Sequence, residues 1–154
     1  MVYAQPDDPP VLKITRILNA TRQEVFAAWT DPASVQQWLC PEAASVARVE
    51  LDVRVGGAFR IDMQDQDDYV IHTGIYREIK SPERLVFTWV SKYTQHRETL
   101  VTVELVERGD QTELVLTQVQ LPDEEARQRH AFGWVSIMAH LATYMEHKLK
   151  PKNF

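Results

Sequence analysis

The amino-acid sequence predicts an α+β fold in which an antiparallel sheet packs against one long C-terminal helix. From residue 44 to residue 120, apolar and polar residues alternate with a period of two, and short turn-rich segments interrupt the alternation. Short connections between successive strands are typical of an antiparallel meander. From 123 to about 148, apolar residues instead recur at steps of three and four, which indicates a helix.

The segment before the sheet region contains one strand and two short helices. A strand-like pattern covers 11–18, and a capping box of the form Thr-x-x-Glu begins at Thr21 and predicts the start of the first helix. Asp31 is the expected N-cap of the second helix, with Pro32 at its first helical position. We expect Pro41 to end this helix.

Six further strands and the long helix follow. Turn residues such as Gly56-Gly57 and Ser81-Pro82-Glu83 mark the connections between the strands. Pro151 is expected to stop the helix. The predicted strands cover 44–54, 57–64, 69–80, 84–92, 98–107 and 112–120.

The long helix has an unusual composition. Gly133 lies near its middle, where glycine costs about 1 kcal/mol relative to alanine, and we expect a close approach to another backbone as the reason. We also expect Trp134 to project into the space under the sheet, so that Trp134→Ala changes ligand binding as well as stability. The apolar face comprises Trp134, Ile137, Met138, Leu141, Tyr144 and Met145.

Composition narrows the class of protein. The 154 residues fit one domain, with 1–10 and 149–154 as a flexible leader and tail. The net charge of −5 argues against a nucleic-acid binder. The single cysteine, Cys40, excludes an internal disulfide framework, and no apolar run approaches the roughly 20 residues that cross a bilayer. We therefore expect a soluble, cytoplasmic protein without membrane insertion, as a monomer or homodimer.

Several segments carry a family resemblance. The run TRQEVFAAWTDP over 21–32, DVRVGGAF over 52–59, PERLVFTW over 82–89 and the pair Gly133-Trp134 resemble motifs of the activator-of-heat-shock-ATPase-like family. The resemblance extends from about residue 11 to residue 147. This family belongs to the START-like (helix-grip, SRPBCC) superfamily.

The resemblance implies a helix-grip fold with a curved seven-stranded antiparallel sheet. It also implies a cavity between sheet and C-terminal helix that holds a hydrophobic small molecule or lipid, and it allows a chaperone contact. A binding module is therefore the leading hypothesis. The expected ligand-binding residues are Trp38, Phe59, Ile61, Met63, His72, Tyr76, Phe87, Trp89, Val103, Trp134, Met138 and Leu141.

Two other functions stay open. A cyclase, dehydratase or hydrolase would need a polar pair in the cavity, such as His72 with Asp62 or Glu104. However, a surface or hydrogen-bonded histidine of the sheet is the simpler explanation of His72. A stress-related co-chaperone-like interaction domain is the third hypothesis. We assign no catalytic residue and no cofactor, and the spacing of the five histidines predicts no metal site.

Overall fold

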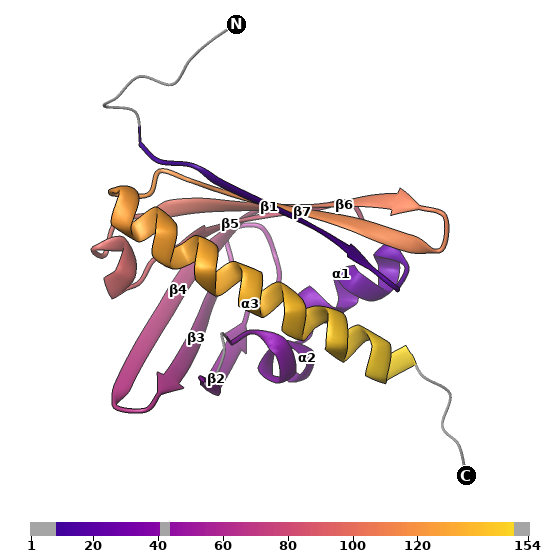
Figure 1. Ribbon diagram of the computed structural model, residues 1–154, viewed down its shortest axis with the longest axis horizontal. Coiled ribbons are helices and arrows are strands. Elements are labelled where there is room, and N and C mark those ends of the chain that lie inside the picture. The colour runs from indigo at the N-terminus through magenta and orange to yellow at the C-terminus, as the bar shows by residue number, and fades with distance from the viewer. Residues whose placement is uncertain (1–8, 41–43, 150–154) are drawn as a thin grey trace, which may run out of the picture.

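An antiparallel sheet and one long helix form the described part of the molecule, which comprises residues 9–40 and 44–149 of a computed structural model (Figure 1). The predicted fold class is confirmed. Pro41 and Pro151, the expected helix stops, lie outside the described residues. In chain order the elements are β1 (Leu12–Leu18), α1 (Arg22–Thr30), α2 (Pro32–Trp38), β2 (Ser45–Leu51), β3 (Ala58–Asp65), β4 (Asp68–Lys80), β5 (Arg84–Trp89), the short 3-10 helix η1 (Lys92–Thr94), β6 (Thr99–Arg108), β7 (Gln111–Val119) and α3 (Glu124–Leu149).

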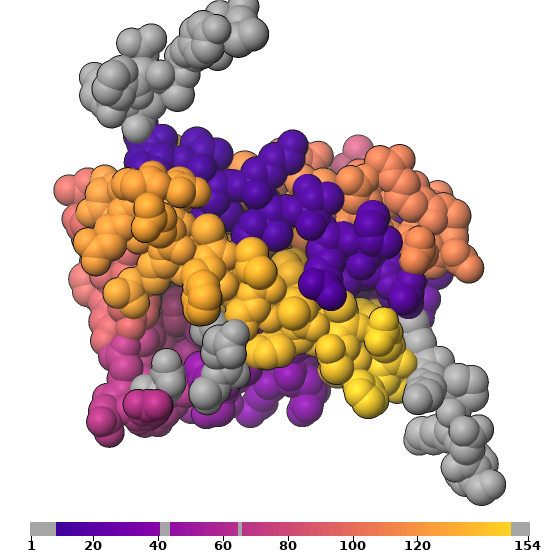
Figure 2. Space-filling model, in the orientation of Figure 1, coloured from indigo at the N-terminus to yellow at the C-terminus, as the bar shows by residue number. Residues whose placement is uncertain are grey.

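The seven strands form one sheet in the order β1-β7-β6-β5-β4-β3-β2, and all neighbours are antiparallel. β4 joins the two halves of this sheet, because Asp68 to Ile75 pair with β3 and Tyr76 to Lys80 pair with β5. The two halves diverge, and α3 runs diagonally between them (Figure 1). Figure 2 shows the atoms of α3 packed between those of β1 and those of α2. The sheet and α3 thus enclose the interior.

The first two helices begin as the sequence predicts. The Thr21 hydroxyl accepts a hydrogen bond from the backbone N–H of Glu24 over 3.2 Å, and the Glu24 carboxylate accepts one from the backbone N–H of Thr21. This reciprocal pair satisfies two N–H groups at the start of α1. At the start of α2, Asp31 makes no side-chain bond to the backbone and instead accepts from the Ser34 hydroxyl over 2.9 Å.

At Gly74 two neighbouring strands and the ring of Phe59 approach closely. A Cβ atom on Gly74 would lie 2.0 Å from the backbone oxygen of Thr88 and 2.3 Å from the ring of Phe59. A side chain at this point of β4 therefore has no room. At Gly133, in contrast, a Cβ atom would meet nothing within 4 Å. The predicted reason for Gly133, a close backbone approach, is wrong.

Aromatic side chains fill the centre of the space between the sheet and α3. The Trp29 and Trp38 rings pack edge to face with centroids 4.7 Å apart, and the Trp89 and Trp134 rings lie 5.2 Å apart. Phe87 lies 6.3 Å from Trp29. These rings leave a void of only about 20 Å³, the size of a single water molecule. The centre of the fold is therefore a packed core.

The length and hydropathy of the helices show whether any of them could span a membrane. Within 9–40 and 44–149, no helix combines the length and the apolar character that crossing a membrane requires.

Candidate functional site

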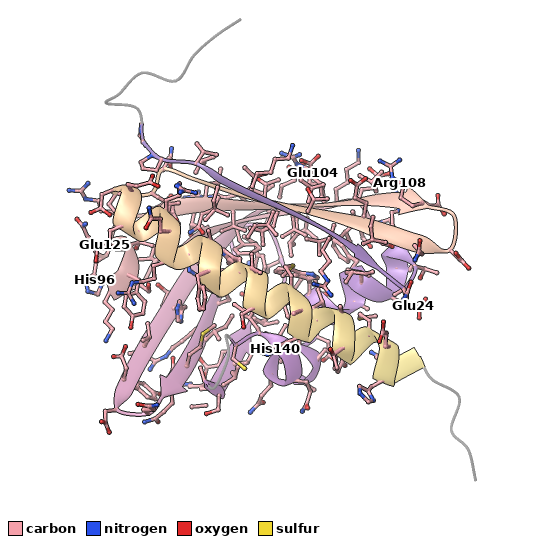
Figure 3. All side chains as sticks on the ribbon, viewed as in Figure 1. Glu24, His96, Glu104, Arg108, Glu125 and His140 are labelled. Atoms are coloured by element: carbon pink, nitrogen blue, oxygen red, sulfur yellow. The ribbon has the colours of Figure 1, made fainter. Side chains whose placement is uncertain are left out.

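A cavity of about 340 Å³ opens at one end of this core, beneath the first half of α3. Glu125 and His96 mark this end of the molecule in Figure 3. β3, β4 and β5 supply one wall, α3 supplies the opposite wall, and η1 closes the end. Apolar side chains make up most of the lining. The lining residues are Ala44, Met63, Asp68, Val70, His72, Trp89, Tyr93, Arg129, His130, Phe132, Gly133, Trp134 and Ile137.

An aromatic surface joins the two walls of the cavity. The His72 ring lies 4.8 Å from the Trp89 ring, and the Trp89 ring lies 5.2 Å from that of Trp134. The three residues come from β4, β5 and α3, so the surface spans both walls. Such a surface suits a flat apolar ligand, because stacked and tilted aromatic rings attract beyond their buried area.

A buried chain of hydrogen bonds holds the two tryptophans of this surface in place. The Trp134 indole N–H donates to the Gln118 side-chain oxygen over 2.9 Å, and the Gln118 amide donates to the Thr99 hydroxyl over 3.0 Å. The Thr99 hydroxyl then donates to the backbone oxygen of Trp89 over 2.6 Å. The chain runs from α3 through β7 and β6 to β5, and it therefore fixes the width of the cavity at its inner end.

His72 projects from β4 into the cavity wall. Its side chain is only 7% exposed, and its Nδ1 lies 3.3 Å from the backbone oxygen of Ile61. Burial lowers the pKa of His72 from 6.5 to about 4, and the carbonyl groups of Ile61 and Val70 oppose this shift only in part. His72 is therefore a neutral imidazole at neutral pH.

His130 faces the same cavity from α3. It is 9% exposed, and its Nδ1 lies 2.7 Å from the backbone oxygen of Ala126, one helical turn earlier. Burial lowers the pKa of His130 as well. Electrostatic repulsion from His130 also lowers the pKa of His72. The cavity thus contains two neutral imidazoles on opposite walls.

A charged group of residues borders the cavity. The Asp68 carboxylate accepts hydrogen bonds from the Lys92 ammonium and the Tyr93 hydroxyl, and the bond from Lys92 lowers the pKa of Asp68. The Arg129 guanidinium lies 4.3 Å from the centre of the Tyr93 ring. These contacts tie η1 to β4 and to α3. Phe132, which is 68% exposed, lies beside them at the mouth of the cavity.

The structure separates the predicted ligand-binding residues into three groups. Met63, His72, Trp89 and Trp134 line the cavity of 340 Å³. Five others border the small central void of 20 Å³ and not the cavity, and three are packed in the core and line neither space. The five are Trp38, Phe59, Ile61, Tyr76 and Phe87, and the three are Val103, Met138 and Leu141.

His130 lines the cavity but is absent from the expected ligand-binding residues, as are Gly133 and Ile137 of the same helix. It precedes Trp134 by four positions and Ile137 by seven, so it continues the apolar face of α3 by one turn. No periodic pattern in the sequence marks Tyr93 or Arg129 as lining residues. Their contact depends on how η1 packs against α3. Ala44 and Val70 likewise border the cavity without a distinctive pattern.

The polar pair that catalysis would need is not assembled. Ile61 and Met63 face the interior, and Asp62 therefore projects from the opposite face of β3, where it binds Arg60 at 2.9 Å and the Tyr69 hydroxyl at 2.5 Å. Glu104 is exposed and pairs with Arg84 at 3.4 Å. Neither carboxylate shares the cavity with His72. Within the described residues, no group of three or more His, Cys, Asp or Glu side chains could hold a metal ion.

Comparison with known proteins shows the family to which the chain belongs. The sequence model of the family described as Activator of Hsp90 ATPase homolog 1-like protein matches residues 19–146. The chain belongs to this family. The family and its START-like fold were both predicted from the sequence motifs, and both are confirmed. This fold is typical of ligand-binding domains.

Solved structures of similar proteins have the same fold. A protein from Chromobacterium violaceum is 26% identical, with a TM-score of 0.79 over 88% of this chain and 96% of its own. The AHSA1 protein from Silicibacter pomeroyi is 25% identical, with a TM-score of 0.78 over 90% of this chain and 99% of its own. A search of curated proteins found no match. The matches cover almost the whole chain length of these relatives.

Proposed function

We propose that this Activator of Hsp90 ATPase homolog 1-like domain binds a compact, largely apolar small molecule in the cavity beneath α3. The observation that supports this function is the volume of about 340 Å³ with a mostly apolar lining and a few polar groups. Small-molecule sites have this character and range from roughly 300 to 1,000 Å³. The volume lies at the lower end of the range and favours a compact molecule over a long-chain lipid.

Gly133 supports the same function. A glycine inside a helix costs about 1 kcal/mol relative to alanine, yet the space next to Gly133 is open and no neighbour would oppose a side chain. Because Gly133 lines the cavity, a larger residue there would occupy the volume that a ligand needs. The helix thus gives up stability at a position that borders the cavity.

The test is a screen with a variant that blocks the cavity. Native mass spectrometry and thermal shift with compact aromatic and alicyclic compounds should detect binding to the native protein. Gly133→Leu should fold and abolish that binding. Val135→Leu is the matched control, because Val135 lies on the same helix, is 56% exposed and does not line the cavity. Equal binding by all three proteins, or no binding by any, would refute the proposal.

Binding does not require catalysis, and we propose none. Among the described residues, Asp62 and Glu104 lie outside the cavity, and the Asp68 carboxylate that lines it accepts hydrogen bonds from Lys92 and Tyr93. We also propose that the protein is located in the cytoplasm. The single free cysteine, Cys40, fits such a reducing compartment.

A further inference from the structure

Each of the two cavity histidines has one nitrogen engaged by the backbone. Nδ1 of His72 lies beside the carbonyl oxygen of Ile61, and Nδ1 of His130 lies beside that of Ala126. A carbonyl oxygen can only accept, so Nδ1 carries the hydrogen in both rings. Since a neutral imidazole has a single N–H, Nε2 of each ring is an unprotonated acceptor. Burial lowers the pKa of both rings, in agreement with this neutral form.

Nε2 of each histidine has no hydrogen-bond partner among the described residues. In this part of the chain, the side-chain nitrogens and oxygens that are both inaccessible and unpartnered are Nε of Arg22 and Nε1 of Trp29, and neither Nε2 is among them. The side chains of His72 and His130 are buried from bulk solvent and line the cavity.

Two charged side chains, Asp68 and Arg129, are among the residues that line the cavity. Asp68 is compensated by Lys92 and Tyr93, and Arg129 lies over the Tyr93 ring at the border. A ligand group that reaches Nε2 of either histidine meets an acceptor. A hydroxyl or N–H that loses its hydration there would therefore find a hydrogen-bond partner.

We propose that the cavity selects a flat aromatic molecule whose polar group is a neutral hydrogen-bond donor, a phenolic hydroxyl or a ring N–H, which donates to Nε2 of His72 or His130. The aromatic body lies against the surface formed by His72, Trp89 and Trp134. This inference rests on the proposed function and adds the chemical class of the ligand to it.

The experiment compares two probes of nearly equal shape, 2-naphthol and 2-methylnaphthalene, by titration calorimetry. Only 2-naphthol has a donor, and 2-methylnaphthalene is the more apolar of the two. The native protein should bind 2-naphthol about fivefold or more tightly. His72→Phe and His130→Phe each keep an aromatic ring but remove one acceptor. In at least one of them the preference should fall threefold or more. His147→Phe, at an exposed position near the end of α3, should keep the native preference.

The outcomes separate the two proposals. If the native protein and both variants bind the two probes with an unchanged ratio, the cavity binds apolar molecules but the donor class is wrong. If 2-methylnaphthalene binds the native protein more tightly, the donor class is wrong as well. If neither probe binds the native protein, the proposed function fails and the inference fails with it. Two variants are used because a single one that does not fold would otherwise leave the question open.

Discussion

The Trp134 indole N–H donates to the Gln118 side-chain oxygen over 2.9 Å inside a region from which water is excluded. This bond joins α3 to β7, and Trp134 itself is only 2% exposed. It explains why a glutamine can be fully buried on the face of β7 that also carries Leu114 and Leu116. It also sets the position of the residue that separates the cavity from the packed core.

Gln118→Leu should lower the free energy of unfolding by about 1–3 kcal/mol, because it leaves the Trp134 N–H buried without an acceptor. Trp134→Phe removes the donor, and the double variant should lose less than the two single losses added together, since neither partner is then left unpaired. Urea unfolding of the native protein, the two single variants and the double variant measures these free energies. Gln111→Leu is a control at an exposed position of β7. Strict additivity would show that the bond has no energetic coupling.

The two glycines at Gly74 and Gly133 should respond in opposite directions to alanine. Gly133→Ala should raise the free energy of unfolding by about 1 kcal/mol, because its Cβ meets open space and alanine favours the helix. Gly74→Ala should lower it by about 2–3 kcal/mol, because its Cβ would collide with Thr88 and Phe59. Chemical unfolding checks both values. A destabilised Gly133→Ala protein would contradict the open space beside this residue.

His72 should make stability depend on pH. Its pKa is 6.5 in the unfolded chain and about 4 in the folded protein, so between these values the unfolded chain binds a proton that the folded protein does not. The free energy of unfolding should therefore fall as pH falls from about 6.5 toward 4, by about 2 kcal/mol between pH 7 and pH 5 from this group. Above pH 6.5 the contribution is complete and constant.

Urea unfolding at pH 7, 6 and 5 tests this dependence. His72→Phe should remove about 2 kcal/mol of the decrease, while the part that arises from His130 remains. His147→Phe, at an exposed position, should keep the native pH profile. Parallel profiles for the native protein and His72→Phe would show that His72 titrates normally in the folded state.

The order of elements could be predicted because local patterns determine it. The capping box at Thr21 begins α1 as expected, and the three- and four-residue periodicity predicts a helix over 123–148 that the structure places at Glu124–Leu149. The family motifs added the curvature of the sheet. Each of these features depends on residues that are close together in the sequence, so it can be recognised without knowledge of the fold.

The cavity itself could not be predicted in the same way. In β4, His72 alternates with Ile71, and both possible inner faces contain apolar residues, so alternation left the direction of His72 open. The cost of glycine at Gly133 indicated a reason for its presence but could not distinguish a close backbone from an open space. Whether four tryptophans fill the interior or leave a void depends on their mutual packing, which is a property of the folded core.

The most direct test of ligand binding in this cavity uses the methionine methyl groups as reporters. With 13C-methyl labelling, Met63 reports on the cavity, while Met138 and Met145 report on the packed core. Titration with 2-naphthol or 2-methylnaphthalene should shift the Met63 signal saturably and far more than the two core signals, since an aromatic ligand in the cavity places its ring beside that methyl group. Saturable binding that leaves the Met63 signal in place, or no saturable shift with either probe, would contradict the account.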